Sequence, residues 1–342
     1  MAQPSLMLAE ANESPASVAR LFASEAEVIS EVGAWLRDQP PALVTMAARG
    51  SSDHAATFFK YLMELSTGIP VASIGPSVAS VYRRPLRLAS AVHFTVSQSG
   101  ASPDIVALQA AAKAGGARTV AIVNVADSPV AREADITIVL GAGPEKSVAA
   151  TKSFITSAAA LAAIVGAATQ NVGFSRALDS LPDALAKTVQ IDLSEPQQVL
   201  AASRSLYTCG RGTALGIAME TALKCKETAG LHAEAFSMAE IMHGPLRLVE
   251  RGFPVIGYVQ EDSAFDNSRE AMGKLADLGA RTITFSSKPA PGVSVMVPST
   301  GNGLLDPLVA LLPAYRLVEA VTIEKGLDPD QPANLLKVTE TM

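Results

Sequence analysis

The chain has 342 residues, which is enough for two domains of ordinary size. Hydrophobic residues make up 49% of it and charged residues 18%, so we expect large buried cores, and a formal net charge of −6 offers no basic surface for nucleic acid. The only cysteines, Cys209 and Cys225, exclude a disulfide framework and fit a reducing compartment. The first fifteen residues lack the pattern of a secretory signal, and the alanine-rich run 157–169 is too short to span a bilayer. We therefore expect a cytoplasmic protein without a membrane or nucleic-acid partner.

The first half of the chain alternates short apolar runs with helical patterns. Residues 1–40 predict an amphipathic helical lead-in that stops at Pro40-Pro41. Apolar runs then predict five strands, each followed by a turn and in most cases a helical pattern, at residues 42–47, 71–74, 91–96, 119–125 and 136–140. Strands that alternate with helices predict an α/β fold, doubly wound around a parallel sheet. We place this first domain at residues 41–175.

The second half repeats the first. Arg211-Gly212-Thr213 matches the turn Arg49-Gly50-Ser51, and residues 278–285 match residues 115–122. The offsets between the matched glycines are 212 − 50 = 162 and 279 − 116 = 163, so the two matches are nearly in register. This predicts two related domains in tandem, each a helix–sheet–helix sandwich with a mainly parallel five-stranded sheet. The second domain is placed at residues 190–325, and the tail at 326–342 has no periodicity, which by itself is typical of a frayed end.

Hydroxyl-rich loops follow two of the predicted strands. Ser97, Gln98, Ser99 and Ser102 come after the third strand, and Ser51-Ser52 after the first. Ligands of open parallel sheets bind beyond the carboxyl ends of the strands, and serine hydroxyls beside a helix N-terminus make an anion site. Plain helix capping is the alternative, although it would need only one serine. We therefore predict a site for a compact phosphate monoester.

The same loops give no indication of a nucleotide cofactor. Neither GxGxxG nor GxxxxGK[ST] is present in them, so we expect no dinucleotide, no ATP and no other cofactor. The matching loop of the second half, residues 260–263, is acidic and should repel a phosphate. One phosphate site per chain is therefore expected. Arg49 and Arg211 are interpreted as hydrogen-bonding or salt-bridging residues of the fold.

Residues 219–250 carry most of the groups that can move protons. Glu220, Lys224 and Glu227 follow an i, i+4, i+7 pattern and share one face of a predicted helix, and His243 comes later in the run. A solvated charged face is the alternative, but the apolar neighbours favour acid–base chemistry. Glu227 as base, His243 as acid and the amines of Lys224 and Lys337 are the groups needed to open a sugar phosphate and move a proton between C1 and C2. No metal is required.

A zinc site is a weaker alternative. His232-Ala233-Glu234 looks like the first half of the zinc deaminase signature, but the second half, P-C-x-x-C, is absent. We interpret His232 as a structural or substrate-side hydrogen-bonding residue.

Four motifs in this order and spacing resemble a known family. They are SQSG, VAATK, the run from ALKCKE to MHGPL, and DQPANLLKVTE, at residues 97–100, 148–152, 222–246 and 330–340. Together they resemble the isomerase half of glucosamine–fructose-6-phosphate aminotransferase, a tandem pair of sugar isomerase (SIS) domains. The resemblance covers nearly the whole chain from about residue 40.

The resemblance implies roles for individual residues. Ser52 and the SQSG loop with Ser102 would bind the phosphate of a sugar phosphate, and the backbone of Val148 would touch the sugar. Glu227 would shuttle the C1–C2 proton with Lys224 nearby, and Lys337 would react with the carbonyl, so the tail would fold over the pocket. His243 would open the ring in the site of a neighbouring subunit, which implies a homodimer that shares this histidine.

Two departures from the synthase shape the functional hypothesis. Ala2 stands where the synthase carries its glutaminase cysteine, so we expect no glutamine hydrolysis by that route. The phosphate loop reads SQSGASPD, which looks like stand-alone relatives that remove ammonia from amino sugar phosphates. The hypothesis is a glucosamine-6-phosphate deaminase that gives fructose 6-phosphate and ammonia. The alternatives are a galactosamine or fructosamine phosphate as substrate, or a non-catalytic SIS sensor, against which Glu227, His243 and Lys337 argue.

Overall fold

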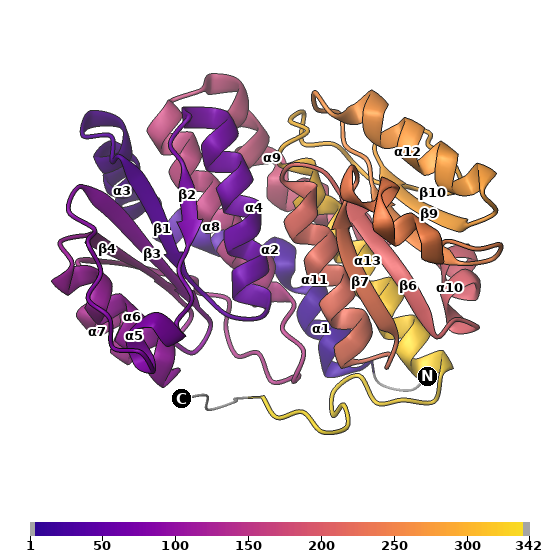
Figure 1. The fold of residues 1–342 in the computed structure, drawn as a ribbon, viewed down its shortest axis with the longest axis horizontal. Helices are drawn as coiled ribbons and strands as arrows, with labels where there is room; N and C mark the ends of the chain where they lie inside the picture. The colour runs from indigo at the N-terminus through magenta and orange to yellow at the C-terminus, as the bar shows by residue number, and fades with distance from the viewer. Residues whose placement is uncertain (1–3, 338–342) are drawn as a thin grey trace. The chain divides into compact units, whose positions relative to one another are not determined.

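A computed structural model describes residues 4–337 of the chain, which form two compact units (Figure 1). The first unit comprises residues 16–145 and 152–178, and the second comprises residues 4–15, 146–151 and 179–337. Ala2 and the last three residues of the fourth motif, Val338-Thr339-Glu340, lie outside the described residues. Within the predicted lead-in, the chain forms α1 (Leu6–Asn12), α2 (Ser14–Ser24) and α3 (Ala26–Asp38).

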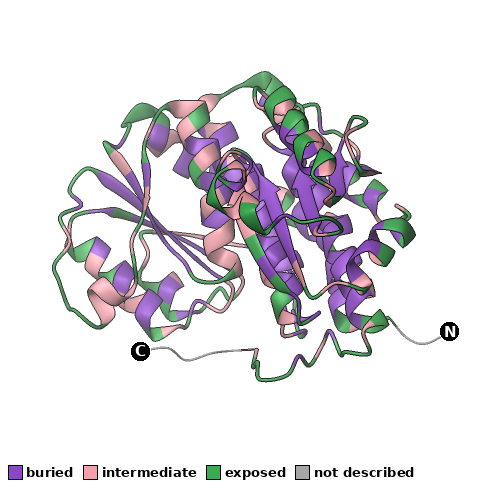
Figure 2. Ribbon diagram, turned by 45° about the vertical axis from the view of Figure 1, so that its right-hand side comes forward, coloured by how far each residue is buried: buried purple, intermediate pink, exposed green. Residues whose placement is uncertain are grey.

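The first unit is built on a five-stranded parallel sheet. Its strand order is β2-β1-β3-β4-β5, with bounds β1 (Leu43–Ala47), β2 (Val71–Ser73), β3 (Ala91–Ser97), β4 (Arg118–Val123) and β5 (Ile136–Val139). The helices after α3 are α4 (Ser51–Thr67), α5 (Ser77–Ser80), α6 (Pro103–Ala114), α7 (Pro129–Glu133) and α8 (Lys152–Thr169). Of the next helix, α9 (Val172–Thr188), the residues up to 178 belong to the first unit and the rest to the second. Every residue of β3 is buried, as expected for a parallel strand covered on both faces (Figure 2).

Helix α8 is the apolar centre of this unit. It packs against α3 and α4, and it is long and apolar enough to cross a membrane by length and composition. However, 83% of this 18-residue stretch is buried inside the protein, as is typical of the core helix of a globular unit.

The second unit repeats the architecture. Its parallel sheet has the order β10-β9-β8-β6-β7, with bounds β6 (Ser205–Gly210), β7 (His232–Ser237), β8 (Pro254–Tyr258), β9 (Arg281–Ser286) and β10 (Val293–Met296). Its helices, besides α1, are α10 (Ser194–Ala201), α11 (Ala214–Glu227), α12 (Phe265–Asp277) and α13 (Asp306–Glu324), with short 3-10 turns η1 (Glu240–Met242) and η2 (Gly244–Leu248).

The tandem repeat predicted from the sequence is confirmed. When β6–β10 are matched to β1–β5 in chain order, the two sheets have the same strand order. The matched glycines also share their backbone conformation, with φ of 54° and 59° at Gly50 and Gly212, and 94° and 92° at Gly116 and Gly279. These left-handed values favour glycine, which explains why these positions of the repeat stand out in the sequence.

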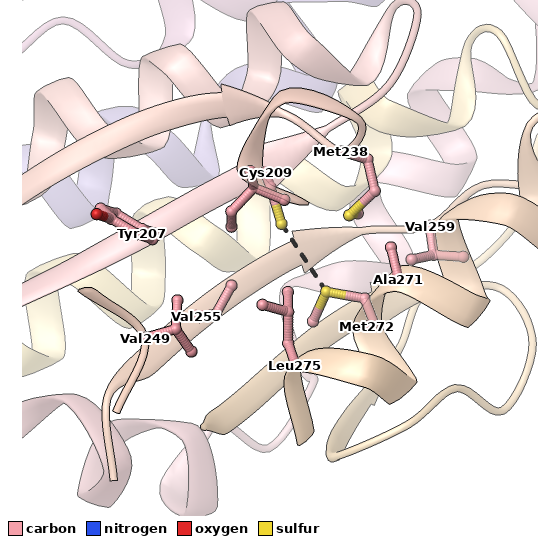
Figure 3. Close-up of a cluster of buried hydrophobic side chains, with 10 residues drawn as sticks. Tyr207, Cys209, Met238, Val249, Val255, Val259, Ala271, Met272 and Leu275 are labelled. Carbon is pink, nitrogen blue, oxygen red and sulfur yellow. Dashed lines mark hydrogen bonds between the residues drawn. The ribbon is translucent and has the colours of Figure 1, made fainter. Parts of the chain in front are cut away.

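One buried apolar cluster of the second unit contains Cys209. Cys209 on β6 lies among Met238, Val255, Met272 and other apolar side chains from β8 and α12 (Figure 3). Both cysteines are free and fully buried, and burial raises the pKa of each thiol to about 12. A protonated, buried thiol is a packing group rather than a nucleophile.

Candidate active site

The first unit places its serine loops at the point where the strand order reverses. Strands β1 and β3 are neighbours, and α4 and α6 begin shortly after them. The N-cap residues of these helices are Gly50 and Ser102, and neither makes a side-chain capping hydrogen bond. Ser102 thus occupies the N-cap position of α6, but its hydroxyl does not cap the helix. Two helix N-termini at the switch point of a parallel sheet form the usual place for an anion.

The loop after β3 is fixed by hydrogen bonds to its backbone. Ser97 Oγ accepts from the Gly100 N–H at 3.1 Å, and the Gln98 carbonyl accepts from the Asn124 N–H at 3.2 Å. The Gly100 carbonyl accepts from the Val130 N–H at 3.0 Å. The side chains of Gln98, Ser99 and Ser102 remain partly exposed, as do those of Ser51 and Ser52. The loop is therefore rigid at its base while its polar side chains can reach a ligand.

Gly100 is required by both the backbone and the space around it. Its φ is 61°, and a Cβ atom here would lie 2.6 Å from Ser128 Cβ and closer still to Ser128 Oγ. Ser128 is 2% exposed, and its hydroxyl caps α7 by accepting from the Ala131 N–H. An added methyl group would therefore displace the clamp loop or break this cap.

We expect Gly100→Ala to lower the free energy of unfolding by about 2–3 kcal/mol, from left-handed strain plus overpacking. It should also weaken binding of a sugar phosphate at least about tenfold, by a loss of roughly 1.4 kcal/mol. Gly141→Ala is the matched control, because Gly141 has φ of 59° and nothing within 4 Å of its added Cβ. Urea unfolding and calorimetric titration measure both effects. Equal losses in the two variants would contradict the steric argument.

An ion pair balances a buried acid beside this loop. Asp104, in the first turn of α6, is fully buried and accepts a hydrogen bond from Arg49 Nε at 2.6 Å, while the Arg49 Nη2 also pairs with it. This confirms the interpretation of Arg49 as a salt-bridging residue. Without that arginine, a carboxylate two residues from Ser102 would oppose the binding of an anion.

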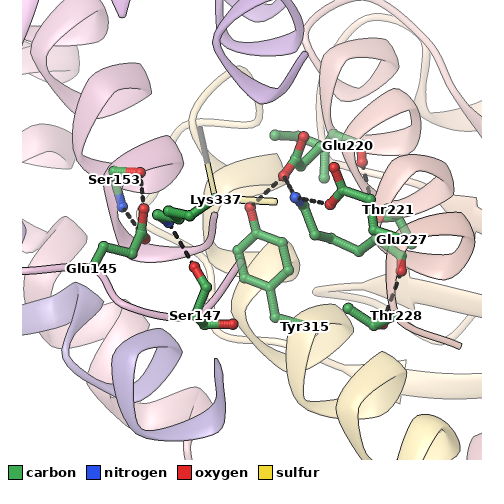
Figure 4. A network of polar contacts seen from close by, with 11 residues as sticks. Glu145, Ser147, Ser153, Glu220, Thr221, Glu227, Thr228, Tyr315 and Lys337 are labelled. Carbon is green, nitrogen blue, oxygen red and sulfur yellow. Dashed lines mark hydrogen bonds and ion pairs between the residues drawn. The ribbon is translucent and has the colours of Figure 1, made fainter. Parts of the chain in front are cut away.

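The second unit holds the predicted catalytic helix. Lys224 on α11 is buried, and its Nζ donates to Glu227 Oε2 at 2.5 Å and lies 3.4 Å from Glu220 Oε1. Glu220 is fully buried and also accepts from the Tyr315 hydroxyl on α13 at 3.0 Å (Figure 4). The side chain of Glu227 is 24% exposed, so it is the one carboxylate of this cluster that a ligand can reach. The shared face predicted for these three residues is present.

The tail lysine lies beside the loop that carries Val148. Lys337 Nζ donates to the Ser147 carbonyl at 2.6 Å, and both residues belong to the second unit (Figure 4). Val148 is the next residue and is partly exposed. The tail up to Lys337 is therefore ordered against this loop rather than frayed.

His243 lies apart from these contacts in the turn between η1 and η2. Its side chain is exposed and makes no hydrogen bond to any residue between 4 and 337. His232 and Glu234, on β7, are also exposed, and residues 4–337 contain no cluster of three or more His, Cys, Asp or Glu side chains with metal-ligand geometry. Of the predicted site residues, Lys224 thus contacts Glu227, and Lys337 contacts the loop that carries Val148. These four residues belong to the second unit, and the clamp serines belong to the first.

Sequence reasoning missed two residues that contact the catalytic helix and the Val148 loop. Tyr315 supports Glu220 from 95 residues away, and Glu10 accepts hydrogen bonds from the backbone of the Val148 loop from 136 residues away. The one local signal for Glu10 is its place on the buried face of α1, between Met7 and Ala11.

The comparisons with known proteins agree with this architecture. The SIS domain family matches residues 42–167 and 199–293. The chain belongs to the SIS domain family. It is 34% identical to the isomerizing glutamine–fructose-6-phosphate aminotransferase of Pyrobaculum aerophilum and 30% identical to that of Streptococcus pneumoniae, in each case over 98% of this chain. The chain spans 57% and 58% of the length of these relatives, which corresponds to their isomerase portion.

Solved structures share the fold of this chain over almost its full length. A structure described as a phosphosugar isomerase from Silicibacter pomeroyi superposes with a TM-score of 0.90 at 44% identity, covering 96% of this chain and all of that one. The C-terminal domain of glucosamine–fructose-6-phosphate aminotransferase from Francisella tularensis gives 0.85 at 25% identity, covering 96% and 99%. A glucosamine-6-phosphate deaminase from Thermotoga maritima gives 0.77 at 22% identity, covering 98% and 100%, which shows a common fold.

Proposed function

We propose that this SIS protein is a glucosamine-6-phosphate deaminase. The observation that carries the proposal is the pairing of a partly exposed carboxylate, Glu227, with the buried ammonium of Lys224. A non-catalytic sugar sensor needs a phosphate clamp but has no use for a carboxylate held in this way. The sugar isomerase relatives supply the class of substrate.

The steps that lead from the sugar phosphate to the imine each have a residue that could perform them. The serine loops of the first unit would bind the phosphate, and His243 would protonate the ring oxygen as the ring opens to the C1 aldehyde. Glu227 would take the proton from C2 and return it to C1, while one proton passes from the amine nitrogen to the C1 oxygen, which turns the 2-amino aldehyde into a C1 alcohol with an imine at C2. Water then adds to the imine carbon, and ammonia leaves to give fructose 6-phosphate. Lys337 would stabilise the negative charge that develops on the C1 oxygen.

The choice of deaminase over synthase rests on the phosphate loop, which reads SQSGASPD and carries Ala101-Ser102 after the glycine, where the synthase usually has glutamate and threonine. A second candidate is aldose–ketose isomerisation of a sugar phosphate without an amine. The likeness to the Silicibacter pomeroyi structure, described as a phosphosugar isomerase, favours it. We also propose a homodimer that shares His243, and the exposure of this side chain in the single chain supports it.

The test is a substrate panel with purified protein. Glucosamine 6-phosphate, galactosamine 6-phosphate, a fructosamine phosphate, glucose 6-phosphate, and fructose 6-phosphate with glutamine are each followed for ammonia and for ketose formation. We expect ammonia and fructose 6-phosphate from the first sugar. Ammonia from only one of the other amino sugars would keep the deaminase reaction and identify that sugar as the substrate. Ketose formation from glucose 6-phosphate without ammonia would favour the isomerase. Binding without turnover of any sugar would refute an enzymatic function.

A further inference from the structure

The N-terminal helix α1 is tied to the loop that carries Val148. Glu10, in the second turn of α1, is only 5% exposed. Its Oε1 accepts from the Lys146 N–H at 2.5 Å, and its Oε2 accepts from the Ser147 N–H at 3.2 Å. One carboxylate thus binds two successive backbone amides, which is a charge-assisted arrangement that fixes the orientation of the peptide between them.

The same loop carries the contact to the tail lysine. The carbonyl of Ser147, on the residue whose N–H binds Glu10, accepts from Lys337 Nζ at 2.6 Å. Glu10 and Lys337 therefore hold opposite polar groups of one residue. A rotation of the peptide at Ser147 would change the position of the Lys337 amine as well as that of the neighbouring Val148.

Helix α1 is itself held by the base of the tail. Asp330 Oδ2 and Oδ1 accept from the N–H groups of Leu6 and Met7 at 2.7 and 2.8 Å, and Ser5 donates to Glu319 on α13 at 2.7 Å. A helix of seven residues is too short to be stable alone, so its order depends on such contacts. The tail thus contacts α1 through Asp330 and the Ser147 loop through Lys337. Glu10 adds a direct contact between α1 and the Ser147 loop.

We propose that Glu10 is a positioning residue for Lys337 and for the Val148 loop. The catalytic consequence of this role rests on the proposed function. The link from Glu10 through Ser147 to Lys337 does not, because the hydrogen bonds alone establish it. Glu10 lies in a segment that none of the four SIS motifs covers. Its effect would be exerted through the backbone that it orients.

The test compares Glu10→Gln and Glu10→Ala with Glu13→Gln, an exposed acid in the same N-terminal segment. Glutamine keeps one acceptor oxygen and alanine keeps none. Hydrogen exchange read by mass spectrometry should show at least about tenfold faster exchange for the amides of Lys146 and Ser147 in Glu10→Ala, a change of roughly 1.4 kcal/mol in opening free energy, and a smaller change in Glu10→Gln. Exchange in α11 should stay as in the wild type, and Glu13→Gln should change nothing.

The kinetic readout separates positioning from folding. On the amino sugar that the wild type turns over, Glu10→Gln should lower kcat by about 10²-fold with KM nearly unchanged, because a shift of one ångström near a reacting group has this effect. If the amides of Lys146 and Ser147 exchange at the wild-type rate in both Glu10 variants, Glu10 does not hold this loop. If they exchange faster while kcat stays normal, Glu10 holds the loop but has no role in catalysis.

A wild type that is inactive on every sugar would refute the proposed function but not this inference. In that case the rate of reductive methylation of Lys337 tests whether Glu10 positions this lysine. The Lys337 amine should react faster in the Glu10 variants than in Glu13→Gln, because the loop that holds it is no longer fixed. Equal rates in all of them would overturn the inference.

Discussion

Replacing Glu227 with glutamine is expected to lower ammonia release from glucosamine 6-phosphate by about 10³-fold while sugar-phosphate binding stays intact. Glutamine has the same shape and can still accept from Lys224 Nζ, which now lies 2.5 Å from Glu227 Oε2. It cannot take up the C2 proton. The loss should therefore fall on kcat rather than on KM, and calorimetric titration with fructose 6-phosphate should give the wild-type affinity.

Isotope transfer makes the role of this carboxylate more specific. With deuterium at C2 of the substrate, the wild type should place part of the label at C1 of the ketose and lose the rest to water, and Glu227→Gln should do neither. Glu250→Gln serves as control, since Glu250 is an exposed acid of the same unit. A Glu227→Gln variant that keeps more than a tenth of the wild-type kcat would exclude Glu227 as the base.

The sequence was sufficient to predict the two sheets because parallel strands buried on both faces appear as continuous apolar runs. The repeated glycines with left-handed φ marked equivalent turns in the two halves. The shared face of Glu220, Lys224 and Glu227 was predictable as well, because helical periodicity is a local property.

Long-range contacts of the site were not predictable in this way. The partner of Glu220, Tyr315, and the partner of the Ser147 loop, Glu10, come from helices far away in the chain, and no spacing rule connects them. Whether Ser102 caps its helix or leaves its hydroxyl for a ligand is also a question of side-chain geometry, which the sequence does not contain.

Lys224→Met is expected to lower the free energy of unfolding of the second unit by about 3–5 kcal/mol. The substitution keeps the volume of the side chain but removes the ammonium that lies between two carboxylates, one of which, Glu220, is fully buried. Lys274→Met is the matched control, because Lys274 pairs with Glu270 at the same i, i+4 spacing with both side chains more than half exposed. An exposed pair of this kind contributes about 0.5 kcal/mol. Urea unfolding followed by circular dichroism measures both, and similar losses in the two variants would contradict the importance of burial.

The double variant Lys224→Met with Glu220→Gln separates the two contributions of Lys224. Because the large loss comes from a buried charge without its counter-ion, neutralising Glu220 should restore at least about 2 kcal/mol of the free energy of unfolding. It should not restore ammonia release, since Glu227 still lacks the donor that fixes its orientation. Recovery of both stability and kcat would mean that the ion pair serves the fold alone. Recovery of stability without kcat would show that the buried ammonium also positions the exposed carboxylate at the end of α11.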